Sequence, residues 1–254
     1  MSSNATQGYG RGTLCHVMLF NIALEKVVRD SGLQRERTIF TKSIQLLGYA
    51  DEVVQIGKHT FEVVDRFTYL GAIVQMDNDT THEIKHQINM ANKCYFGLLR
   101  TMKRRVLSRS VKVCLYKTLI RPVLTYACET WAISKNNEYA LQYFERKILR
   151  RVYGPICENG VWRKRYNQEL YDLFKVVDIS KFIKLTRLRW TGHVRRKEDS
   201  EICKMIWSAQ PEGSRKRGRP RVRWKDEVDG DARDLGLRNW WREALDRANW
   251  RKIL

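Results

Sequence analysis

Two adjacent carboxylates in the first quarter of the chain have the setting of a metal site. Asp51 and Glu52 lie within the segment 46–56, between two apolar runs of strand length. This pattern predicts a β-hairpin that presents both carboxylates at its turn. Mg²⁺ is usually held by one or two protein carboxylates plus substrate phosphates, so the pair could serve two-metal phosphoryl transfer. An ordinary hairpin is the alternative, because acidic residues are common in turns.

A second motif indicates zinc chemistry. His82-Glu83-Ile84-Lys85-His86 fits H-E-x-x-H, in which two His one helical turn apart bind Zn²⁺ and the Glu is the general base. A protease of this kind needs a third ligand, and residues 87–92 contain no glycine or histidine at the metzincin spacing. A zinc hydrolase is therefore the remote alternative.

The elements around the acidic pair are a helix and further strands. Residues 19–28 place apolar side chains at helical spacing and precede Gly32, so a helix is predicted upstream. Downstream, residues 61–64 and 67–71 are rich in aromatic and β-branched side chains, which favours strands.

In these segments the chain resembles the reverse transcriptase of LINE-type (non-LTR) retrotransposons, most closely the RTE-like group. The resemblance begins with Leu-Phe-Asn-Ile-Ala-Leu-Glu-Lys at 19–26, the Tyr-Ala-Asp-Glu box at 49–52 and Phe-x-Tyr-Leu-Gly at 67–71. It continues through segments at 119–126, 129–131, 144–151, 166–171, 187–194 and 218–224. It implies the end of a polymerase palm, a thumb and a basic C-terminal region. It also implies a catalytic Asp51, a Mg²⁺ site at Asp51 and Glu52, and a primer-grip-like hairpin at Phe67, Tyr69, Leu70 and Gly71.

The departures from the family bear on catalysis. The family has a second aspartate where this chain has Glu52, and Gly10-Arg11-Gly12 stands in place of its Gln-Gly-Asp loop. The fingers and the palm strand that supplies another catalytic aspartate have no counterpart. A two-metal site cannot be completed without that carboxylate. We therefore expect Asp51 to be a remnant, polymerase activity to be absent, and Mg²⁺ to be a cofactor only if activity remains.

Composition favours a nucleic-acid partner. The formal net charge is +20, and a basic surplus of this size favours polyanions through counterion release. Residues 161–254 contain 25 basic and 14 acidic side chains, and seven of the eight tryptophans. Interleaved cations and indoles suit single strands, because bases stack on aromatic faces. The alternative is that the tryptophans are core or packing residues between helices.

The segment 214–221, Ser-Arg-Lys-Arg-Gly-Arg-Pro-Arg, has no apolar residue to pack and is predicted to be an exposed arm. It could contact phosphates, serve in nuclear import, bind the A·T minor groove as an AT-hook does, or be merely a solvated loop. The predicted nucleic-acid-binding residues of the whole chain are Arg104, Arg105, Arg150, Arg151, Arg195, Arg196, Arg215, Lys216, Arg217, Arg219, Arg221, Arg223 and Trp224.

The middle of the chain has helical periodicity. Apolar stripes run from Ile84 to Met102 and from Leu141 to Val152, and they are predicted to be core faces. The opposite faces carry Lys85, Lys93 and Arg100 on the first stretch and Arg146, Lys147, Arg150 and Arg151 on the second. In a polymerase thumb such faces would grip the backbone of a duplex, although charged outer faces are often only solvated.

The predicted class is α+β, mostly α: short palm hairpins at 1–75, a helical thumb-like domain at 76–155 and a basic Trp-rich helical region at 156–254. The six cysteines lack C-x-x-C spacing and fit a reducing compartment. No apolar stretch is long enough to span a membrane, and the basic cluster favours the nucleus over the cytoplasm. Exposed palm strand edges could need a protein partner.

Three hypotheses about the protein follow from the sequence. The chain is an inactive fragment of an RNA-directed DNA polymerase that retains nucleic-acid affinity, an adopted DNA- or RNA-binding or scaffold protein, or a decayed genomic copy.

Overall fold

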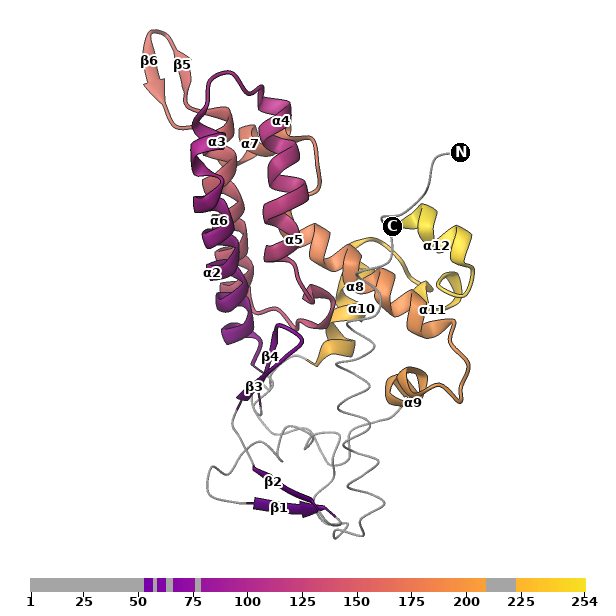
Figure 1. Cartoon of the computed structure of the whole chain (residues 1–254). Coiled ribbons are helices and arrows are strands. Elements are labelled where there is room, and N and C mark those ends of the chain that lie inside the picture. The colour runs from indigo at the N-terminus through magenta and orange to yellow at the C-terminus, as the bar shows by residue number, and fades with distance from the viewer. Residues whose placement is uncertain (1–52, 57–58, 63–65, 76–78, 209–222) are drawn as a thin grey trace, which may run out of the picture. The chain divides into compact units, whose positions relative to one another are not determined.

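The computed structural model describes residues 53–56, 59–62, 66–75, 79–208 and 223–254 (Figure 1). Over these ranges the protein is mostly helical and has three two-stranded antiparallel sheets, which confirms the predicted α+β, mostly α class. The chain splits into two compact units. Thr81–Leu188 and Trp224–Gly236 form one, here called the helical unit, and the other described residues belong to the second. No helix among the described residues is long and apolar enough to cross a membrane.

Two small hairpins precede the helical unit. Strand β3 (Arg66–Tyr69) pairs with β4 (Ala72–Gln75) around a turn at Leu70 and Gly71, whose φ angles are 48° and 86°. Positive φ at both central residues is the geometry of a type I′ hairpin turn, so the hairpin predicted from Phe67 to Gly71 is confirmed.

The first hairpin bears on the acidic pair. Strand β1 (Val53–Ile56) pairs with β2 (His59–Glu62) downstream. Asp51, Glu52 and the apolar run before them lie outside the described residues. The expected presentation of two carboxylates at a turn therefore stays a prediction.

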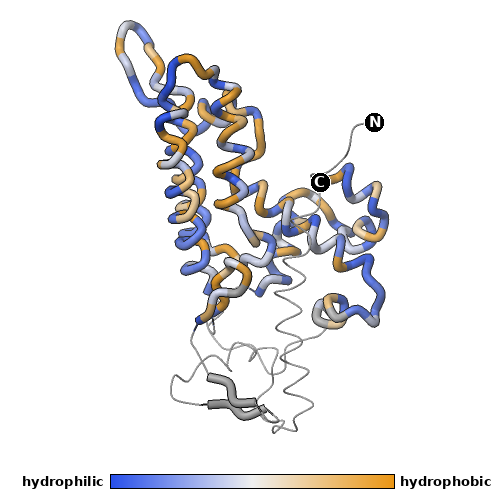
Figure 2. The backbone as a smooth tube through the Cα atoms, viewed as in Figure 1, coloured by the Kyte–Doolittle hydropathy of each residue, from blue (hydrophilic) through white to orange (hydrophobic). Residues whose placement is uncertain are grey.

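The first part of the helical unit follows the predicted stripes. Its elements are α2 (Thr81–Gly97), α3 (Leu99–Lys103), α4 (Arg109–Leu115), a π-helical turn (Tyr116–Ile120), α5 (Arg121–Leu124), a 3₁₀ turn (Cys128–Thr130) and α6 (Lys135–Tyr153). Ile84, Ala91 and Tyr95 of α2 are buried against Leu141 and Ile148 of α6, in one apolar core. Figure 2 shows hydrophobic and hydrophilic residues interleaved along these helices, as expected where each helix buries one face.

Serine side chains cap the beginnings of two helices. The hydroxyl of Ser108 accepts a hydrogen bond from the Val111 N–H and begins α4. Ser134 does the same for Asn137 at the start of α6. Serine is favoured at this position because its oxygen satisfies a backbone donor that has no partner within the helix.

A buried carboxylate joins three segments of the helical unit. Glu145 of α6 is 0% exposed; it accepts hydrogen bonds from the Tyr116 hydroxyl at 2.8 Å and the Ile179 N–H at 2.9 Å. Burial raises the pKa of Glu145, and the two donors and the nearby Arg121 oppose that rise. Arg121 itself donates to the carbonyls of Val177 and Asp178, at 2.8 and 3.2 Å.

The remaining elements are β5 (Ile156–Glu158), β6 (Val161–Arg163), α7 (Asn167–Phe174), α8 (Ile179–Arg195), α9 (Ile202–Ser208), α10 (Trp224–Asp234), α11 (Trp240–Glu243) and α12 (Arg247–Ile253). The sequence placed a domain boundary between residues 155 and 156, and this position falls inside the helical unit. Helix α7 packs against α6, and Leu170 and Phe174 share the apolar core with Phe144.

A close approach fixes α12 against the end of α8. A Cβ built on Gly192 would lie 2.2 Å from Nε1 of Trp250, whose side chain is 3% exposed. Any side chain at position 192 must therefore displace a buried indole.

We expect Gly192→Ala to destabilise the second unit by about 1–3 kcal/mol, because overpacking forces the indole and its backbone to shift. Gly230→Ala in α10 is the matched control, since a Cβ there meets nothing within 4 Å, and alanine gains up to about 1 kcal/mol over glycine in a helix. Urea unfolding followed by tryptophan fluorescence measures both variants. An unchanged midpoint for Gly192→Ala would contradict the packing of α12.

Candidate nucleic-acid interface

One long stretch of the helical unit has no carboxylates. The 45 residues from 84 to 128 contain ten Lys or Arg and no Asp or Glu. Eight of these cations are exposed from α2 to the π-helical turn: Lys85, Lys93, Arg100, Lys103, Arg104, Arg105, Arg109 and Lys117. The prediction named Arg104 and Arg105 as contact residues but did not include Lys103, Arg109 and Lys117. The run without Asp or Glu is the signal that could have found them.

Helix α6 adds a second basic row beside α2. Lys147 is exposed, and its ammonium donates to Oδ1 of Asn92 in α2 at 3.3 Å. The same ammonium lies 5.4 Å from the ring centroid of Phe96 and 5.9 Å from that of Tyr95. Arg151, one turn further, is close enough to Tyr95 to oppose the rise that burial causes in the pKa of its phenol. The two rows therefore belong to one surface.

We call this surface the α2–α6 face and define it by Lys93, Phe96, Arg100, Tyr143, Lys147 and Arg151. All six side chains are exposed, and the two aromatic ones are 58% (Phe96) and 67% (Tyr143) exposed. Large aromatic groups with this exposure next to cations can stack on bases while the cations contact phosphates.

Other predicted contact residues take part in packing. Arg150 is half-buried and donates to Oδ1 of Asn167 at 2.7 Å. In the second unit, Arg195 and Arg196 donate to the carbonyls of Trp241 and Ala244, at 3.5 and 2.6 Å. These guanidinium groups satisfy side-chain or backbone acceptors within the fold, so only part of each is available to a phosphate.

The remaining predicted contact residues belong to the segment 214–221 or follow it closely in the sequence. Arg223 is exposed, whereas Trp224 is half-buried and its indole N–H donates to the Glu129 carbonyl at 2.7 Å. Arg215, Lys216, Arg217, Arg219 and Arg221 lie outside the described residues, as Asp51 and Glu52 do.

Exposure separates the C-terminal tryptophans. Trp240 and Trp250 are buried, and Trp190, Trp207 and Trp224 are half-buried. Trp162 and Trp241 are 69% and 44% exposed. The packing interpretation thus fits most of these indoles, and Trp162 is the most exposed among them.

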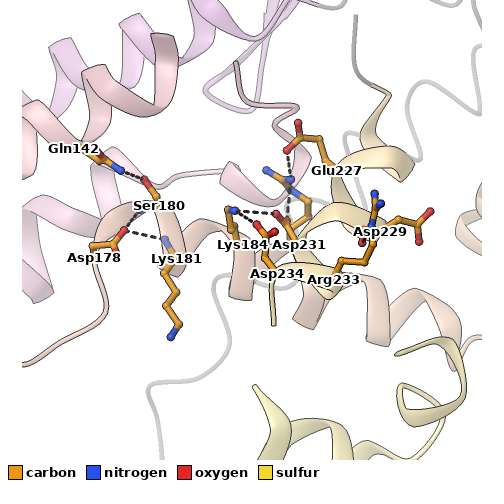
Figure 3. A network of polar contacts seen from close by, with 11 residues as sticks. Gln142, Asp178, Ser180, Lys181, Lys184, Glu227, Asp229, Asp231, Arg233 and Asp234 are labelled. Atoms are coloured by element: carbon orange, nitrogen blue, oxygen red, sulfur yellow. Dashed lines mark hydrogen bonds and ion pairs between the residues drawn. The ribbon is translucent and has the colours of Figure 1, made fainter. Parts of the chain in front are cut away.

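The carboxylates of the helical unit gather on α10. Residues 224–236 contain five acidic and two basic side chains, whereas residues 81–188 contain eight acidic and 22 basic. Arg187 of α8 is 1% exposed and forms ion pairs with Glu227 at 2.7 Å and Asp231 at 2.9 Å (Figure 3). Lys184 lies 2.5 Å from Asp234 and 3.8 Å from Asp231. Both cations are therefore neutralised locally.

A pocket of about 240 Å³ lies at this acidic cluster and includes Asp226, Glu227, Asp231 and Asp234 in its lining. Burial raises the pKa of Asp231 to about 6, because the cost of desolvation outweighs the attraction of Arg187 and Lys184. With Glu138 the lining has five carboxylates against two cations, Lys184 and Arg187, so the pocket is unfavourable for a polyanion. The nucleic-acid candidate is therefore the α2–α6 face.

The glutamate and the first histidine of the H-E-x-x-H segment have different environments in the fold. Glu83 is 4% exposed and accepts a hydrogen bond from the side chain of Gln87 at 2.8 Å, while His82 is exposed. Within the described ranges, no three His, Cys, Asp or Glu side chains are grouped so as to hold a metal ion. Glu83 is therefore poorly placed to act as a general base in solvent.

Asp231 should make the stability of the helical unit depend on pH. Its pKa is higher in the folded than in the unfolded chain, so the folded state binds the proton more tightly. Its contribution to the free energy of unfolding therefore falls as pH rises from about 4 to about 6. The stability of wild type relative to Asp231→Asn should fall over this range by at most about 3 kcal/mol, and by less where water reaches the carboxylate.

Urea unfolding at several pH values measures this difference, and Asp234→Asn controls for loss of a carboxylate from the same helix. A difference between wild type and Asp231→Asn that is constant from pH 4 to 7 would contradict the assigned shift.

Comparison with known proteins gives a transposon-related origin. The chain is 25% identical over 197 residues to a Caenorhabditis elegans protein whose name marks it as uncharacterised and transposon-derived. The aligned region covers 75% of this chain and 70% of that relative. No family model matches the sequence. No solved structure matches the chain. The chain is thus related to a transposon-derived protein.

Proposed function

We propose that this transposon-related chain is the C-terminal part of a LINE-type reverse transcriptase, without polymerase activity of its own, and that it binds DNA or RNA through the helical unit. The observation that carries the proposal is the carboxylate-free stretch 84–128, whose exposed cations lie beside those of α6. The LINE-type origin rests on the sequence resemblance, and it is a more specific assignment than the relationship to a transposon-derived protein.

The chemistry of the α2–α6 face suits a nucleic-acid backbone. Lys93, Arg100, Lys147 and Arg151 are exposed on it, and Lys or Arg side chains that neutralise phosphates release condensed counterions. Such contacts position a strand or duplex and carry no sequence information directly. Binding that depends strongly on salt and weakly on sequence is the expected behaviour.

A second candidate function is an adopted DNA- or RNA-binding or scaffold role. It is favoured by the packing of Arg195, Arg196 and Trp224 within the fold, because these residues then help to hold a stable protein. It differs from the first proposal in predicting selectivity for a sequence or a partner.

We place the protein in the nucleus, since the segment 214–221 has the composition of an import signal.

Polymerase activity is expected to be absent, because Glu52 stands where the resembling family has its second aspartate, and the longer side chain would displace a metal ligand. Primer extension on a homopolymer RNA template with Mg²⁺, then with Mn²⁺, should give no product with wild type or Asp51→Asn. Extension by wild type that Asp51→Asn abolishes would instead establish an enzyme with Mg²⁺ as its cofactor.

The triple variant Lys93→Gln, Arg100→Gln and Lys147→Gln should bind a nucleic acid more weakly than wild type and with a flatter salt dependence. The slope of log Kobs against log salt should fall by about 0.7–0.9 for each phosphate contact removed. Fluorescence anisotropy of a labelled oligonucleotide at several salt concentrations measures both effects.

The matched control is Lys181→Gln, Arg251→Gln and Lys252→Gln, which removes the same number and kinds of exposed cations, none of them among the residues that define the face. Equal losses in the two triple variants would mean that net charge alone, and not the α2–α6 face, determines binding.

A further inference from the structure

The β5–β6 hairpin presents an exposed tryptophan on a braced support. Asn159 and Gly160 have φ angles of 51° and 81°, the tight I′ turn that matches the twist of the flanking strands. Strands β5 and β6 pair Ile156 with Arg163 and Cys157 with Trp162. Trp162 is 69% exposed, and Cys157 opposite it is also exposed.

One face of the hairpin is tied to the rest of the helical unit. The Arg163 guanidinium donates to Glu158 on the facing strand at 2.5 Å and to Glu169 of α7 at 2.6 Å. It also lies 4.5 Å from the ring centroid of Tyr166. The hydrogen bond from Arg163 and a second one from the Tyr166 backbone N–H hold the pKa of Glu169 down at about 2.

The tryptophan belongs to the other face. Side chains alternate along a strand, so Trp162 and its cross-strand partner Cys157 point away from the face that carries Arg163 and Ile156. Fixing the strand without covering the indole leaves a large aromatic surface in a defined orientation. Such preorganisation lowers the entropic cost of binding.

The charges near the hairpin favour a nucleic acid as its binding partner. Lys164 follows β6 directly and is exposed, and Arg165 donates to the Gly154 carbonyl at 3.2 Å, which holds this basic pair next to the end of α6. Arg151 of the α2–α6 face lies in that last turn of α6. Glu158 of the hairpin and Glu169 of α7 both pair with Arg163, and the cations Arg163, Lys164 and Arg165 together outnumber these two carboxylates. An exposed aromatic ring with cations around it fits a nucleic-acid strand, which offers both base faces and phosphates. It fits an acidic or an apolar protein surface less well.

We propose that Trp162 stacks on an unpaired base, so that the nucleic acid held by this unit is single-stranded or has an unpaired segment. The inference rests on the proposed nucleic-acid binding and names its substrate class. A base in a closed duplex has its faces covered by neighbouring pairs, and a strand with unpaired bases offers them to the indole.

The test uses the full-length chain and two probes of equal length: an oligothymidine strand and a duplex whose two ends are closed by non-nucleotide linkers, so that it contains no unpaired base. Trp162→Ala should weaken binding to the single strand about 30-fold, the middle of the range for loss of one base stack. Its salt slope should equal that of wild type, because no cation is removed. Trp162→Phe, which keeps an aromatic face, should restore most of the affinity.

Tyr139→Ala is the matched control, since Tyr139 is 62% exposed near the beginning of α6. Because Trp162 is exposed, its replacement should leave the circular dichroism spectrum and unfolding midpoint unchanged. Equal affinity of wild type and Trp162→Ala for the single strand would overturn the inference while the proposed function stands. An equal loss on both probes, or on replacing Tyr139, would also overturn base stacking. A wild-type chain that binds neither probe would refute the proposed function itself.

Discussion

The burial of Glu145 is the interaction on which the helical unit depends. A carboxylate at 0% exposure is costly unless its oxygens are hydrogen-bonded, and here the Tyr116 hydroxyl and the Ile179 N–H supply the donors. These donors lie at the π-helical turn and at the first residue of α8, so the carboxylate fixes both to α6. Removing the Tyr116 hydroxyl would leave a buried carboxylate with an unmet hydrogen bond, which costs more than the net gain from making one.

This internal arrangement determines what the surface can do. Glu145 and Glu83 have their carboxylates inside the fold, and the acidic residues of α10 surround the buried Arg187. The cations of α2, α3, α4 and α6 remain on the outside. A unit that buries or pairs its carboxylates and exposes its Lys and Arg attracts polyanions to one surface, the α2–α6 face. The neutral aromatic groups on that face would add contacts that salt does not screen.

The sequence predicted those parts of the fold that local patterns determine. The stripe through Ile84, Ala91 and Tyr95 fixed which side of α2 is buried, and the Phe-x-Tyr-Leu-Gly segment predicted the hairpin of β3 and β4. It could not reveal that Arg187 is a core residue, because its partners Glu227 and Asp231 come 40 or more positions later. The role of Trp224 was hidden for the same reason, since its acceptor is the backbone of Glu129.

The candidate site was predictable in part. Lys93, Arg100, Lys147 and Arg151 were placed on basic helix faces from the sequence and are exposed. Phe96 and Tyr143 were not named, although both fall off the apolar stripes, so helical periodicity is the signal that could have found them. Trp162 was one of seven equivalent candidates until burial separated it from the others.

Hydrogen–deuterium exchange of the full chain, with and without a single-stranded oligonucleotide at saturating concentration, tests the central claim most directly. Nucleic-acid binding by the α2–α6 face predicts slower exchange in α2, α3 and the end of α6. Slower exchange confined to segments outside the helical unit, or no change anywhere, would contradict it.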